Sequence, residues 1–172
     1  MLTNRFVGAI AFSAVLIAAA SSLLFAQGLI TQRALSLDAA QEIARGTVEA
    51  CRANGYHVSV TVIDVNGTLK AFLRDDATAP HTVDFSRRKA YTALTFKRTS
   101  AEIGKMWAAN PPAPDIAGTV GTAGGVPIRL GMEVIGAVGV SGSPGGDKDE
   151  VCANAGIAKI ADQLKGFLSP TP

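Results

Sequence analysis

The hydrophobic period of the sequence changes from helical to strand-like after residue 54, and this change limits the fold more than any other feature. Across residues 36–54, apolar and small side chains recur at helical spacing. Valines then occupy alternate positions from residue 58, and Asn66-Gly67 separates them from a second alternating run. Asn-Gly between two such runs is a strong hairpin signal. The sequence therefore predicts a helix followed by antiparallel strands over 57–64 and 68–74.

The second half of the chain repeats this alternation of helices and strands. Thr82 is suited to cap a helix that runs to about Arg98, and the run Thr99-Ser100-Ala101-Glu102 is a capping box for a short helix through Trp107. A second strand pair follows over 126–130 and 134–141, and its later strand is rich in glycine, which indicates close packing against it. A last helix starts near Asp147, with Val151, Ala155, Ala158 and Leu164 expected on one apolar face. The order α–β–β–α–α–β–β–α predicts an α/β chain of the α+β kind, with one mostly antiparallel sheet and helices packed on its faces.

The first 26 residues have the layout of a secretory signal peptide. Arg5 precedes an almost wholly apolar run over 6–25, and Ala26 precedes polar Gln27 at a plausible cleavage site. The alternative is a retained membrane anchor, because about 20 apolar residues can span a bilayer. We expect cleavage near Ala26, a periplasmic or secreted product, and a single domain over residues 27–172.

The charge balance of the expected product is close to neutral. The whole chain has 16 Lys and Arg against 14 Asp and Glu, and cleavage would remove Arg5. This balance does not require a nucleic-acid partner. Contact with a membrane is expected only through the signal segment, if that segment is retained.

Two cysteines, Cys51 and Cys152, are the only ones in the chain. In an oxidising compartment an isolated pair usually forms a disulfide, and the alternative is two buried free thiols. Cys51 lies at the end of the first predicted helix and Cys152 at the start of the last. If the two are bonded, these helices lie side by side and antiparallel on the same face of the sheet.

The candidate ligand-binding residues lie at and after His81. The chain has two histidines, of which His57 opens a strand and is expected at a solvated or edge position, whereas His81 precedes the second long helix. Arg88 follows His81 by seven residues, about two helical turns, so both side chains can point the same way. With Lys89 and Tyr91 nearby, this face could hold a ligand that bears a metal and carboxylates. The alternative is an ordinary solvated charged face with a partly exposed loop histidine.

Several segments together resemble the GlcG/HbpS-type family. They are VSVTVIDVNGTLKAFLRDDATAPHTVDFSRRKAYTALTF, GGVPI at 124–128 and VIGAVGVSG at 134–142. The resemblance covers about residues 35–164 and implies a profilin-like α–β–α fold that assembles into dimers or larger homo-oligomers. Some members of the family bind haem outside the cell or in the periplasm. The resemblance therefore implies a haem site, with His81 as the candidate iron ligand, Thr82 beside it, and Arg88 and Lys89 as partners of the haem propionates.

The sequence is compatible with three functions. The first is an exported protein that binds haem or a related tetrapyrrole, for sensing, uptake or storage. The second is an enzyme or enzyme accessory that acts on a small organic acid or carbonyl compound, with His81 as general base. The third is an oligomeric structural or signalling partner without a small ligand.

Overall fold

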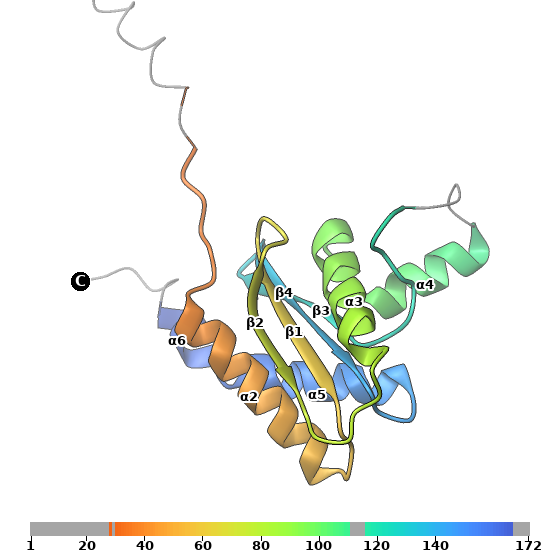
Figure 1. Ribbon diagram of the computed structural model, residues 1–172. Coiled ribbons are helices and arrows are strands. Elements are labelled where there is room, and N and C mark those ends of the chain that lie inside the picture. Colours follow the sequence, from red (N-terminus) through yellow and green to blue (C-terminus); the bar gives the residue numbers. More distant parts are fainter. Residues whose placement is uncertain (1–27, 29, 111–115, 167–172) are drawn as a thin grey trace, which may run out of the picture. The chain divides into compact units, whose positions relative to one another are not determined.

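The computed structural model describes residues 28, 30–110 and 116–166. The chain divides after Gln32, and the unit that begins at Arg33 holds all the helices and strands labelled in Figure 1. The predicted signal peptide over 1–26 lies outside the described residues, so its cleavage and the domain boundary at residue 27 stay predictions.

Four strands form one sheet in which every neighbouring pair is antiparallel (Figure 1). The two predicted hairpins are both present, and they meet through the central strands β1 and β4. The order across the sheet is β2-β1-β4-β3, with bounds β1 (Ser59–Asp64), β2 (Leu69–Arg74), β3 (Gly125–Leu130) and β4 (Glu133–Ser141). At the first hairpin, Asp64 Oδ1 accepts hydrogen bonds from the main-chain N–H groups of Asn66 and Thr68, which holds the Asn-Gly turn.

Helices cover both faces of the sheet, which confirms the predicted α+β fold. α2 (Leu37–Ala53) and α5 (Gly146–Ala158) pack on one face, and α3 (Thr82–Phe96) packs on the other with α4 (Ser100–Ala109) beside it (Figure 1). A short α6 (Ala161–Gly166) follows α5.

The main hydrophobic core lies between the sheet and the α2–α5 layer. Val58, Val60 and Val62 point into it because side chains at alternate strand positions share a face. The α3 side is packed with small residues, which let the helix approach the sheet closely. A Cβ atom added at Gly139 of β4 would lie 2.0 Å from the main-chain oxygen of Ser86 in α3, so the expectation of close packing against this glycine-rich strand is confirmed.

A disulfide joins Cys51 in α2 to Cys152 in α5, with 5.4 Å between the two Cα atoms. One turn before Cys51, Thr47 lies against Gly156 of α5, so the two helices run antiparallel. The predicted bond and the predicted placement of both helices on one face are therefore confirmed.

The structure differs from the predicted elements at three places. Thr82 is the first residue of α3 rather than its cap, since His81 holds the cap position and makes no side-chain cap hydrogen bond. α3 ends at Phe96 because Lys97 adopts a left-handed conformation. The last helix breaks before α6, and Val151 of α5 is exposed rather than on the buried face, which Cys152, Ala153 and Gly156 supply instead. The buried face of α5 is the one that carries Cys152, bonded to Cys51, and the apolar pattern did not reveal it.

Candidate functional site

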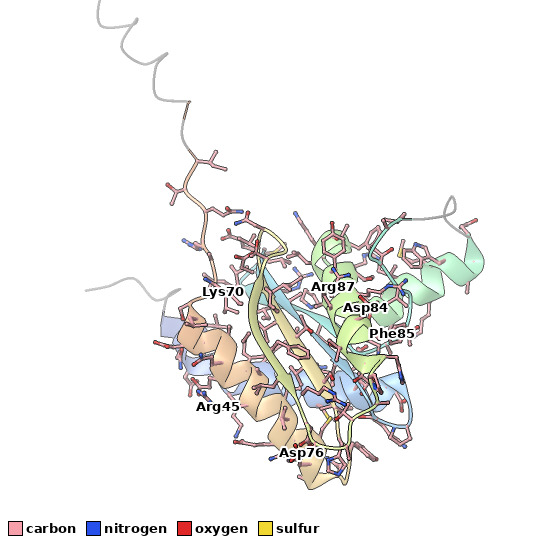
Figure 2. All side chains as sticks on the ribbon, in the orientation of Figure 1. Arg45, Lys70, Asp76, Asp84, Phe85 and Arg87 are labelled. Carbon is pink, nitrogen blue, oxygen red and sulfur yellow. A yellow bond between two sulfur atoms is a disulfide. The ribbon has the colours of Figure 1, made fainter. Side chains whose placement is uncertain are left out.

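A pocket of about 740 Å³ lies at the end of the sheet where α3 and α5 begin. The segment before β1, the loop after β2, the first turns of α3 and the loop after β4 form its walls. In Figure 2, Phe85 marks the first turns of α3 and Asp76 marks the loop after β2. The pocket volume lies within the usual range for small-molecule sites. The residues that line the pocket include Tyr56, His57, His81, Thr82, Phe85, Lys89, Ser143 and Asp149.

His81 lies on the rim of this pocket, and Thr82 lies in its wall. The His81 side chain is exposed, and its imidazole has no hydrogen-bond partner within the ranges that the structure describes. Thr82 is buried, and its hydroxyl donates to the carbonyl oxygen of Ala79. The Thr82 hydroxyl oxygen also lies 2.7 Å from the hydroxyl oxygen of Ser59. Thr82 therefore fixes the start of α3 against β1, whereas His81 is free to turn toward a ligand.

Lys89 lines the pocket through a buried ion pair. Its ammonium lies 2.8 Å from Asp149 Oδ2 and donates to the carbonyl oxygen of Val140, and the two charged side chains are 2% and 3% exposed. The other oxygen of Asp149 accepts from the Ser143 main-chain N–H in the loop after β4. The Lys89 Nζ atom also lies 5.2 Å from the centre of the Phe85 ring. This pair ties α3 to α5 beneath the pocket and leaves little of the lysine charge for a ligand.

Arg88 and Tyr91 are not among the residues that line the pocket. Arg88 donates from its guanidinium to the carbonyl oxygen of Thr119, on the α4 side of α3. The Tyr91 ring lies near Gly67 and Gly118, and it borders a separate depression near the first hairpin. The structure thus brings His81, Thr82 and Lys89 together and places Arg88 and Tyr91 elsewhere.

A second histidine, which the sequence reading expected only at a solvated or edge position, also lines the pocket. His57 Nδ1 lies 3.0 Å from Asp75 Oδ2, and the Asp75 side chain is only 2% exposed. Arg52 at the end of α2 holds both oxygens of the same carboxylate, and its Nε donates to Oδ2 at 2.9 Å. The hydrogen bond from Arg52 is the largest of the effects that keep the pKa of Asp75 well below its usual value, against the opposing effect of burial.

The hairpin register explains why this pair forms. Ser59 pairs with Arg74 across β1 and β2, so the residues just before β1 and just after β2 must meet. The Asp75 main-chain N–H donates to the Val58 carbonyl oxygen, which extends the ladder by one more bond. The predicted hairpin already began at His57 and ended at residue 74, so extending its second strand by one residue would have brought Asp75 next to His57.

The described ranges contain neither a cluster of metal-binding side chains nor a membrane-spanning helix. His, Cys, Asp and Glu side chains form no group of three or more there that could hold a metal ion. None of the helices in those ranges is both long and apolar enough to cross a bilayer.

Comparison with known proteins identifies the family of this chain. The family model described as "Haem degrading protein HbpS-like" matches residues 35–158, which include both histidines and all four strands. The chain belongs to the HbpS-like family. This membership confirms the resemblance to GlcG/HbpS-type proteins that the sequence showed.

Individual relatives agree with the assignment. The Protein GlcG of Escherichia coli K12 is 34% identical over 113 residues, which is 64% of this chain and 84% of that protein. A crystal structure of HbpS is 40% identical with a TM-score of 0.74, and the match covers 76% of this chain and 93% of that one. A Streptomyces reticuli HbpS double mutant has the same identity and TM-score, with 77% and 90% covered. The structure of a PduOC–haem complex is 23% identical with a TM-score of 0.68 over 74% of this chain and 96% of that one, which shows a shared fold.

Proposed function

We propose that this protein binds haem or a related tetrapyrrole in the pocket at the start of α3 and α5, with His81 as an iron ligand. The observation that carries the proposal is that both histidines of the chain line one pocket, together with aromatic and small apolar side chains. Imidazole is a common protein ligand of haem iron, so this donor set suits the group. The description of the family and the haem in the PduOC structure support the same ligand.

Within this site His81 would reach the iron, and Thr82 would hold the start of α3 in place. Phe85 and Tyr56 would contribute aromatic contacts to a flat, apolar macrocycle. The bound group would supply iron redox or ligand-binding chemistry, and the chain would supply its orientation and its exclusion from water. The Lys89 ammonium is already paired with Asp149, which removes the expected partner of a haem propionate as well as that of a small organic acid, so the two histidines of the pocket are what favours haem.

Titration of the purified protein with hemin tests the proposal. We expect a shifted Soret band that saturates at one hemin per chain. His81→Ala should shift the band and weaken binding by about tenfold or more, since a metal ligand is lost. Arg87→Ala is the matched control, because Arg87 is an exposed residue of the same helix that does not line the pocket. An unchanged spectrum of hemin in the presence of the wild-type protein would refute haem binding.

We further propose that the protein works outside the cytoplasm after cleavage near Ala26. The basic residue, apolar run and small residue at the cleavage position support export, and so does a disulfide, which persists in oxidising compartments. Mass spectrometry of the protein from a periplasmic fraction should give a chain that begins at Gln27. Ala26→Tyr should block processing, and a wild-type chain that retains Met1 in the membrane fraction would instead support an anchor.

Assembly into a homo-oligomer is also proposed, through the edge strand β2. Leu69, Phe72 and Leu73 on this strand are 57%, 37% and 37% exposed, which is unusual for such side chains on an unpaired edge. Light scattering after gel filtration should give a mass at least twice that of one chain. Phe72→Glu should lower that mass, and a monomeric wild-type protein would contradict the proposal.

A further inference from the structure

The side chains of Arg52, Asp75 and His57 form a hydrogen-bonded chain that reaches the pocket. Asp75 is buried and receives hydrogen bonds from Arg52, from the Asp76 main-chain N–H and from His57. Arg52 and His57 are each 55% exposed, so the carboxylate is the fixed centre of the group. Since His57 lines the pocket, this fixed centre controls the orientation of one pocket imidazole.

The hydrogen bonds of Asp75 decide which nitrogen of His57 carries the hydrogen. Both oxygens of the Asp75 side chain accept from the Arg52 guanidinium, and Oδ1 also accepts from the Asp76 main-chain N–H, so the carboxylate acts only as an acceptor in this group. The His57 Nδ1 atom, 3.0 Å from that carboxylate, must therefore be the donor. In a neutral ring the hydrogen then sits on Nδ1, and Nε2 carries a free lone pair.

A histidine held through one nitrogen by a carboxylate is the usual arrangement of a metal-binding imidazole, whose other nitrogen ligates the metal. His81 lacks such a partner within the described ranges, whereas His57 has one. We infer that His57 Nε2 is a pre-oriented ligand for the iron of the tetrapyrrole, and that Asp75 is the residue that positions it. This inference rests on the haem-binding function proposed above and names a second, fixed ligand for the same site.

The tautomer can be tested without any ligand. Long-range ¹H–¹⁵N correlation spectra of the full protein at neutral pH should show the His57 ring protonated at Nδ1. Asp75→Asn should weaken this preference, because an amide no longer offers an ionised acceptor. Asp76→Asn is the matched control, since Asp76 is the exposed neighbour of Asp75, and only its main-chain N–H joins the network. A neutral His57 ring that carries its hydrogen on Nε2 and not on Nδ1 in the wild-type protein would overturn the positioning role.

The ligand role is tested by hemin titration of the same variants. We expect His57→Ala and Asp75→Asn each to weaken hemin binding by about 10–100-fold, the range seen when such partners are removed. Asp76→Asn should stay within twofold of the wild type. Added imidazole should restore the wild-type absorption and electron paramagnetic resonance spectra to hemin-loaded His57→Ala, which a purely structural role of His57 would not allow.

The outcomes separate this inference from the proposed function. His57→Ala is the safer variant, because a side chain that is 55% exposed can be removed without opening the core. Wild-type affinity and spectra in both His57→Ala and Asp75→Asn would overturn the inference and leave haem binding standing. A wild-type protein that does not bind hemin would overturn the ligand role together with the proposed function, while the tautomer measurement would still report on Asp75.

Discussion

The disulfide between Cys51 and Cys152 should contribute a large part of the stability of this fold. The bond closes a loop with a sequence separation of 101, which is most of the folded unit. In the chain-entropy model, closing about 100 residues lowers the entropy of the unfolded chain enough to stabilise the protein by about 4.7 kcal/mol. Because each kcal/mol corresponds to about 2–4 °C in a chain of this size, reduction should lower Tm by about 10–20 °C.

Urea unfolding of the oxidised and the fully reduced wild-type protein measures this contribution. The reduced protein is the better comparison, because it keeps both buried sulfur atoms and loses only the bond. The double variant Cys51→Ala/Cys152→Ala should lose slightly more, since it also removes buried side-chain atoms. If the oxidised and reduced proteins differ by less than about 1 kcal/mol, the bond does not act by restraining the unfolded chain.

Three further changes test the packing and charge arguments. Asp149→Ala leaves the Lys89 ammonium buried without its carboxylate and should cost about 3–5 kcal/mol in urea unfolding; a loss below 1 kcal/mol would contradict a buried pair. Gly139→Ala places a methyl group 2.0 Å from a main-chain oxygen of α3 and should cost about 1–3 kcal/mol, whereas Gly166→Ala, with open space around it, should be near neutral; equal effects would refute the close approach. Asp75 has a lowered pKa in the folded state, so its stabilisation is complete above about pH 4, the unfolded value, and is lost as the pH falls below it. Unfolding measured from pH 7 to pH 2 should therefore show a smaller acid-induced loss in Asp75→Asn than in the wild type, and parallel curves would contradict the prediction.

The pocket shows where reasoning from the sequence reached its limit. His81 was predicted to meet a ligand because it begins a long helix next to a loop, and it does lie on the pocket rim. The position of Arg88 was argued from helical spacing alone. Spacing gives the angle around the helix axis, but the sheet beneath α3 decides which angle faces the pocket. Arg88 consequently turns toward Thr119, and the pocket face carries Phe85 and Lys89.

The sequence by itself determined the order of helices and strands up to α5, both hairpins and the single antiparallel sheet, because hydrophobic period, caps and the Asn66-Gly67 turn are local signals that agree with one another. It also supplied the Cys51–Cys152 pair. Only the tertiary structure brought His57 to Asp75 and Arg52, and Lys89 to Asp149, which is 60 residues away in the sequence. The physical reason is that each of these contacts joins two separate segments of the chain. Strand register and helix packing set the distance between the two side chains, and the neighbouring residues in the sequence do not.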